Sequence, residues 1–179
     1  MRTFSAQYII TNTGLPLKRA IINAEDDGTI ISIEKTDGNL KEKHSVEYYN
    51  GIIIPGFVNC HCHLELSHMK GTIEKGSGIG GFVKEVRNTR ENNYENILKS
   101  ASIADSDMYK DGVNLCADIC NTPVSFEIKG KSRIKYLNLL EVFGIDPEKA
   151  EKRMSELLIS GFPETSSAKY SPAYSRYLL

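Results

Sequence analysis

The sequence lacks the features that would place this protein in a membrane or on a nucleic acid. No apolar stretch approaches the roughly 20 residues that a membrane-spanning helix needs. The opening residues, MRTFSAQYII, have neither the long apolar core nor the small-residue cleavage site of a secretory signal. The 22 lysines and arginines nearly balance 23 acidic residues, so no basic field would gather nucleic acid or anionic lipid. We therefore expect a cytoplasmic protein with no membrane or nucleic-acid partner.

Histidine and cysteine are also scarce, with four of each in 179 residues. In a reducing cytoplasm the cysteines would stay as thiols. His44 stands in a charged segment, residues 41–45, where solvent would surround it. A site that uses histidine must therefore draw on the other three, which are His61, His63 and His68.

Residues 1–54 have the pattern of a small antiparallel β-sheet. Short runs that contain apolar residues alternate with turn residues, and Asp27-Gly28 is a strong hairpin signal. Strands are predicted near residues 6–10, 19–24, 29–34 and 46–54. With 40% hydrophobic and 25% charged residues, the whole chain is typical of a globular protein. Its length allows a small domain followed by part of a larger one.

From residue 55 the pattern changes to strands followed by helices. Strands are predicted at residues 56–63, 113–119 and 134–143, and helices at 90–110 and 146–161. Such alternation predicts parallel strands joined by right-handed crossovers. We therefore expect residues 55–179 to form an α/β domain with about three strand–helix units.

The central stretch, residues 51–71, ends its strand with His61 and His63, which have one residue between them. Strand side chains repeat their direction every two residues, so both imidazoles should lie on the same face. Two neutral imidazoles on one face can bind a single transition-metal ion. The alternating Cys60 and Cys62 should point the opposite way, into packing.

The four cysteines offer a second interpretation, a structural zinc site. Cys116 and Cys120 stand four positions apart, within the usual C-x₂₋₄-C range, whereas Cys60 and Cys62 are one residue short of it. If both segments are strands, the two pairs need not converge, and buried apolar-like cysteines are the usual alternative. A zinc-binding module and a non-catalytic fragment therefore stay open beside an enzyme.

A glycine-rich segment, residues 76–81, formally fits the pattern G-x-G-x-x-G. The dinucleotide-binding fingerprint needs a strand directly before it in a compact βαβ unit. Residues 70–75 intervene here, so we interpret the segment as a mobile loop over the strand ends.

The residues around the histidine pair resemble a known family. The ordered string Pro55-Gly56-Phe57-Val58-Asn59-x-His61-x-His63-Leu64-Glu65 is similar to the first-strand signature of the metal-dependent amidohydrolase superfamily, in particular its deaminase and chlorohydrolase branch. The resemblance implies a (β/α)₈ TIM-type barrel flanked by a β-sandwich. Such a barrel takes roughly 250 residues, so residues 55–179 would form the N-terminal half of one. Residues 1–54 would be part of the sandwich.

In that family a divalent metal ion lowers the pKa of bound water, which attacks a carbon bearing an amino group or a halide. The two first-strand ligands map onto His61 and His63. The other ligands and the proton-shuttling glutamate lie on later strands that this chain does not reach. The resemblance thus implies a hydrolase of carbon–nitrogen, non-peptide bonds, which deaminates a small nitrogen heterocycle. Zinc is the first choice of metal, with iron and manganese as alternatives.

Two further expectations follow from the partial barrel. The chain looks truncated, so we expect little or no turnover from it alone. We also expect an uncovered sheet edge that favours aggregation or a homo-oligomer.

Four more side chains near the expected strand ends are candidates. Glu65 is expected to contact substrate or to support a ligand from behind, and His68 to contact substrate or metal. Asp118 and Glu141 end neighbouring strands, where barrel enzymes place functional groups, and each can equally be a structural carboxylate.

Overall fold

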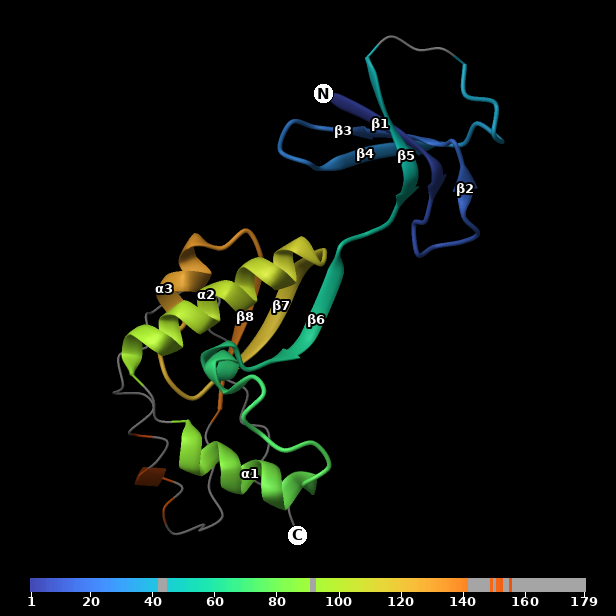
Figure 1. Cartoon of the computed structure of the whole chain (residues 1–179). Helices are drawn as coiled ribbons and strands as arrows, with labels where there is room; N and C mark the ends of the chain where they lie inside the picture. The colour runs from blue at the N-terminus through green and yellow to red at the C-terminus, as the bar shows by residue number, and fades with distance from the viewer. Residues whose placement is uncertain (42–44, 91–92, 142–148, 150, 153–154, 156–179) are drawn as a thin grey trace. The chain divides into compact units, whose positions relative to one another are not determined.

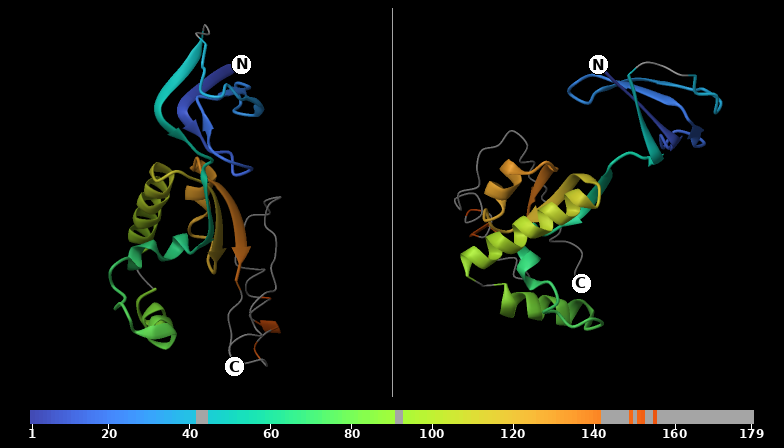
Figure 2. Two further views of the ribbon diagram at one scale, coloured as in Figure 1. Left: turned by 90° about the vertical axis from the view of Figure 1, so that its right-hand side faces the viewer. Right: turned by 45° about the horizontal axis from the view of Figure 1, so that its top comes forward.

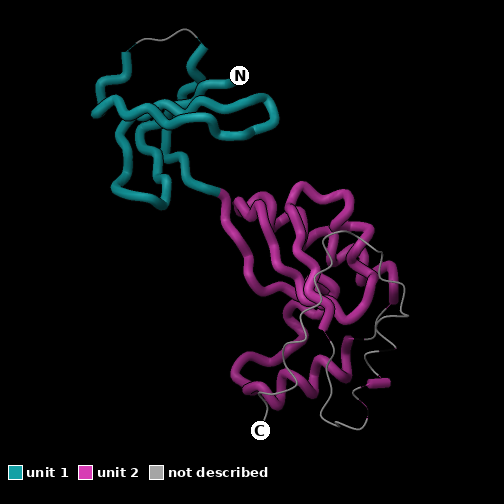
Figure 3. Tube along the Cα trace, turned by 180° about the vertical axis from the view of Figure 1, so that it is seen from behind, with its two compact units in different colours: residues 1–55 teal, residues 56–179 magenta. Residues whose placement is uncertain are grey.

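The computed structural model describes residues 1–41, 45–90, 93–141, 149, 151–152 and 155. The chain forms two compact units, residues 1–55 and 56–179, which Figure 3 shows in different colours. Most of the helix predicted over residues 146–161 lies outside the described residues, as does His44.

The first unit is a five-stranded sheet. Its strands are β1 (Arg2–Ile9), β2 (Leu17–Lys18), β3 (Ile21–Ala24), β4 (Ile30–Glu34) and β5 (Val46–Ile53) (Figure 1). The pairs β1–β2, β1–β3 and β3–β4 are antiparallel, as predicted. The pair β1–β5 is parallel. The long segment between these two strands provides the crossover that a parallel pair needs, so the sheet is mixed and not purely antiparallel.

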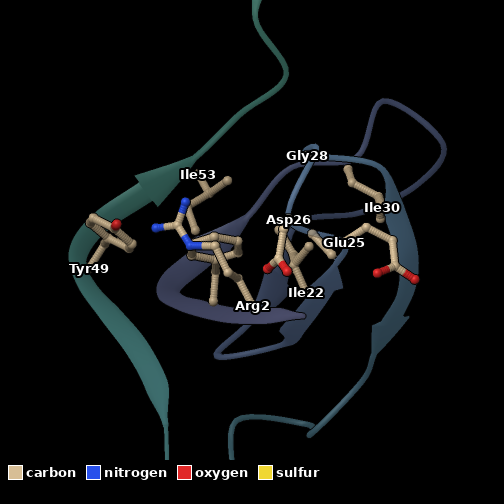
Figure 4. Close-up of a pocket in the computed structure, with 10 residues that line it drawn as sticks. Arg2, Ile22, Glu25, Asp26, Gly28, Ile30, Tyr49 and Ile53 are labelled. Atoms are coloured by element: carbon tan, nitrogen blue, oxygen red, sulfur yellow. The ribbon is translucent and has the colours of Figure 1, made fainter.

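Two apolar regions mark the first unit. The core is formed by Ile9, Ala20 and Ile22, with Phe4, Leu17 and Ile53 packed against it. A cavity of ≈ 350 Å³ opens beside β1, β3 and β5, and Figure 4 shows its lining side chains. Arg2 lines this cavity, lies 4.7 Å from the ring centroid of Phe4 and donates to Glu47 at 2.9 Å. Its charge is therefore already compensated within the unit.

The second unit is built on three parallel strands in the order β6–β7–β8. The strands are β6 (Phe57–Cys62), β7 (Val113–Cys120) and β8 (Lys135–Leu140), and the helices are the 3₁₀ helix η1 (Leu64–Met69), α1 (Gly78–Thr89), α2 (Tyr94–Lys110) and α3 (Phe126–Lys131). Figure 2 shows α2 along one face of this sheet. The α/β class and the parallel sheet are thus confirmed. Membership of these strands in a partial barrel stays a prediction.

Helix α2 begins and ends where its sequence dictates. The side chain of Asn93 accepts a hydrogen bond from the Glu95 amide at 2.8 Å, which caps the first turn. Gly112 follows the helix with φ +90°, a conformation that a glycine adopts at little cost. The chain then enters β7 directly. No helix within the described ranges is long and apolar enough to cross a membrane.

Part of the second unit departs from prediction. The glycine-rich segment is not a mobile loop throughout, because α1 begins at Gly78 and contains Gly80 and Gly81. A side chain at Gly81 would lie 2.6 Å from the Cβ of Ser77, so this turn of helix needs a glycine. The short helices η1 and α3 were not predicted, because each has only six residues and too little periodicity to detect.

Three apolar side chains on β6 and β7 are exposed. Phe57, Val58 and Leu115 keep 54%, 55% and 42% of their surface accessible. Val58 and Leu115 are partners across the β6–β7 ladder and are together called the open strand patch. No other part of the described chain covers them.

Candidate metal and substrate site

The histidine pair lies at the carboxyl end of β6. His61 is inside the strand and His63 follows it directly. Their ring centroids are 5.3 Å apart with an interplanar angle of 61°. The two imidazoles therefore lie together, as the two-residue spacing predicts. Their role as metal ligands stays a prediction.

Cys60, before His61, and Cys62, between the two histidines, were both expected to be buried, but only one of them is. Cys62 is partly buried but Cys60 is exposed. The reason is an irregularity in the β6–β7 ladder, where Asn59 pairs with Cys116 and Cys62 pairs with Asp118. Two residues on β6 thus stand opposite one on β7, and the strict alternation of side chains is lost at Cys60. The prediction that Cys60 points into packing is wrong.

His63 and His68 each have a buried ring nitrogen without a hydrogen-bond partner, Nδ1 in His63 and Nε2 in His68. The Nδ1 of His68 lies 3.1 Å from the carbonyl oxygen of Glu65. A carbonyl oxygen can only accept, so this Nδ1 carries the proton and Nε2 of the neutral ring is an acceptor. Buried polar atoms normally have partners, so these two nitrogens are candidates to bind a metal ion or a ligand.

Both histidines line a cavity of ≈ 530 Å³ between η1, α1 and α2. Apolar side chains of α1 and α2 contribute much of the wall, among them Phe82, Val86 and Ile103. A mostly apolar cavity of this size with a few convergent polar groups is typical of a small-molecule site.

Glu65 is held by the protein on all sides. Its carboxylate is 3% exposed and accepts from the Arg90 guanidinium at 2.9 Å, from the Thr122 amide at 2.9 Å and from the Thr122 hydroxyl at 2.7 Å. The Asn121 amide donates at 3.3 Å. Glu65 thus ties η1 to the end of α1 and to the loop after β7. These contacts favour the supporting role over direct contact with substrate.

Asp118 is fully buried in β7. One oxygen accepts from the Leu64 amide at 2.7 Å, and the other forms an ion pair with Lys129 of α3. Burial, the largest single cause, lowers the pKa of Lys129, but the charges of Asp118 and Cys120 and the hydrogen bonds to both together outweigh it, so the net pKa lies above the ordinary value. Asp118 is therefore a paired structural carboxylate and does not point out of the strand ends.

Glu141 follows β8 and contacts the neighbouring strand end. Its carboxylate accepts from the Asn121 side-chain amide at 3.0 Å, and its own amide donates to the Cys120 carbonyl at 2.9 Å. The side chain is half-buried and remains near the carboxyl ends of the strands.

The four cysteines do not build a zinc site. Cys62 and Cys116 are hydrogen-bonded to each other, which raises the pKa of Cys62 and lowers that of Cys116. Cys120 is buried elsewhere on β7, and burial raises its pKa to about 12. Among the described residues, which include all four cysteines, no three His, Cys, Asp or Glu side chains group around one point. The structural zinc alternative is wrong.

The histidine pair fits a metal ion in chemistry but supplies only part of a ligand set. Two adjacent imidazoles, one with a buried nitrogen that lacks a partner, are suitable donors for zinc. A catalytic zinc site usually has three protein ligands, and no third one joins the pair within the described ranges.

Sequence reasoning missed Lys129 and Arg90, which hold Asp118 and Glu65. Each lies on a different element from its partner, Lys129 on α3 and Arg90 at the end of α1. No local pattern marks a lysine or arginine that will be drawn to a carboxylate on another element.

Comparison with known proteins identifies solved structures that share this fold. No family model matches the chain. Among curated proteins, an adenosine deaminase of Helicobacter pylori is 28% identical over 97 residues, which is 54% of this chain and 24% of the deaminase. Among solved structures, Helicobacter pylori aminofutalosine deaminase in complex with methylthio-coformycin has a TM-score of 0.71 at 21% identity and matches 96% of this chain.

Two further solved structures share the fold. Guanine deaminase from C. acetobutylicum with bound guanine has a TM-score of 0.61 at 19% identity over 94% of this chain. Atrazine chlorohydrolase from Arthrobacter aurescens in complex with zinc has a TM-score of 0.60 at 14% identity over 96% of this chain. The chain spans 43%, 45% and 46% of the length of these three solved chains.

These similar structures are two deaminases and a chlorohydrolase, and their likeness to this chain shows a shared fold. The predicted resemblance to the deaminase and chlorohydrolase branch is therefore confirmed at the level of the fold.

Proposed function

We propose that this chain is part of a metal-dependent hydrolase that acts on carbon–nitrogen, non-peptide bonds and deaminates a nitrogen heterocycle. The observation that carries the proposal is the placement of His61 and His63 side by side at the carboxyl end of the first parallel strand. In barrel enzymes this end of the strands holds the active site. The adenosine deaminase and the guanine-bound deaminase among the similar proteins favour a purine-like substrate.

His61 and His63 would hold the ion, with zinc favoured because a neighbour was solved with zinc. A divalent ion bound there would make water a stronger nucleophile near neutral pH. His68 would take a second role, because its buried Nε2 has no partner and can accept a hydrogen bond, and its side chain lines the same cavity as that of His63. An N–H edge of a heterocycle is a suitable donor to it.

Binding tests this proposal better than turnover. The described residues supply two imidazoles, so we expect little ammonia release from the chain alone. We expect a purine-like inhibitor such as methylthio-coformycin to bind by calorimetry only when zinc is present, and His68→Ala to weaken inhibitor binding about tenfold, which is the loss of one buried hydrogen bond. Zinc affinity should not change in this variant. Equal inhibitor binding with and without zinc would contradict the proposal.

A further inference from the structure

A buried lysine links two neighbouring strands of the second unit, β7 and β8. The side chain of Lys129 is 4% exposed and reaches from α3 into the sheet. Its ammonium forms the ion pair with Asp118 and donates to Cys120 Sγ at 3.0 Å and to Asn138 Oδ1 at 3.0 Å. The rings of Phe126 and Tyr136 lie 4.8 and 5.6 Å from it. Burying a charge costs free energy, so a buried lysine with this many partners indicates a specific structural role.

The carboxylate oxygen of Asp118 that faces away from Lys129 binds the backbone beside the histidine pair. Its second oxygen accepts from the amide of Leu64, the residue after His63, at 2.7 Å. This amide opens η1, where His63 stands at the capping position with φ −129° and ψ 75° and gives no side-chain cap. Asp118 thus satisfies an amide that the helix leaves without a partner.

We infer that Lys129 and Asp118 are positioning residues for the histidine pair. Lys129 holds the Asp118 carboxylate in place through their ion pair, and Asp118 fixes the backbone that carries the His63 ring beside His61. This inference rests on the proposed metal-binding function.

The contact is strong enough for this role. A hydrogen bond to an ionised acceptor is shorter and about twice as strong as a neutral one, and 2.7 Å is at the short end for N–H···O. Both partners are excluded from water, so no solvent molecule competes for the Leu64 amide. Loss of the charge on either residue weakens the bond and lets the turn after His63 relax. His63 would then lose its fixed orientation while the rest of the sheet stays paired.

The test compares Lys129→Met and Asp118→Asn with the control Asn138→Ala. Asn138 contacts Lys129 but not Leu64, so the control disturbs the same buried cluster without touching the Asp118–Leu64 bond. Zinc affinity is measured by competition with a chromophoric chelator, cobalt coordination by the visible spectrum of Co²⁺, and stability by thermal denaturation. Residues that orient metal ligands typically contribute 10–100-fold to affinity.

We expect Lys129→Met and Asp118→Asn to weaken zinc binding about tenfold and to alter the Co²⁺ spectrum, whereas Asn138→Ala lowers the melting temperature alone. If Lys129→Met does not fold, Asp118→Asn decides, since asparagine keeps the shape and removes only the charge. Unchanged zinc affinity and Co²⁺ spectrum in these variants would overturn the inference. Failure of the wild-type protein to bind zinc would instead overturn the proposed function, so the two failures are distinct.

Discussion

Removing the carboxylate of Glu65 should loosen the contact between η1 and the end of β7. In Glu65→Ala the amide and hydroxyl of Thr122 lose their acceptor, at present 2.9 and 2.7 Å away. A fully buried donor left without a partner costs about 1–3 kcal/mol, and each of the two donors of the half-buried Thr122 lies toward the lower end of that range. The Arg90 ion pair adds less, because the Arg90 side chain is 35% exposed and solvent screens it. The expected loss in unfolding free energy is therefore about 2–4 kcal/mol, from two donors that each lose their acceptor.

Urea unfolding followed by circular dichroism measures the loss in the free energy of global unfolding. Hydrogen exchange at the Thr122 amide measures the loss of protection at this contact. Glu127→Gln is the matched control. Glu127 is 66% exposed and pairs with Lys131 four residues later, so solvent screens the pair and its loss should leave the free energy of unfolding nearly unchanged. A loss below about 1 kcal/mol in Glu65→Ala, with Thr122 exchange unchanged, would refute the assignment of Glu65 as the residue that ties η1 to β7.

Three further predictions concern other parts of the second unit. In Gly56→Ala the new Cβ would lie 2.0 Å from Nδ2 of Asn114, so we expect the free energy of unfolding in urea to fall by about 1–3 kcal/mol. The control is Gly130→Ala, whose new Cβ meets nothing within 4 Å and which should be neutral or stabilising. Cys120 is buried and burial raises its pKa to about 12, which keeps it a protonated thiol at pH 8. Peptide mapping after iodoacetamide treatment at pH 8 should therefore find exposed Cys60 alkylated and Cys120 protected. Polar substitutions across the open strand patch should reduce self-association in sedimentation experiments, and an unchanged monomer in both forms would count against that patch as an association surface.

The parts of the fold that were predictable depend on local periodicity. The strands and α2 follow from alternation and helical spacing, and the proximity of His61 to His63 follows from the two-residue repeat of a strand. A Pro-Gly turn before an apolar strand and a string of matching residues were enough to indicate the family resemblance.

The parts that were missed depend on contacts between distant residues. Asp118 could be suspected at a strand end, but only the fold brings Lys129 to one of its oxygens and the Leu64 amide to the other. The exposure of Cys60 results from a ladder irregularity between β6 and β7, which the sequence of one strand does not encode. The parallel β1–β5 pair likewise depends on a crossover and not on either strand alone.

The central claim is that His61 and His63 bind a metal ion together. Titration of the full chain with zinc against a chromophoric chelator tests it directly, with the double variant His61→Ala/His63→Ala compared with wild type. We predict one zinc ion per wild-type chain and at least a hundredfold loss of affinity in the double variant, because both imidazole donors are removed. Equal zinc affinity in the two proteins would contradict the claim.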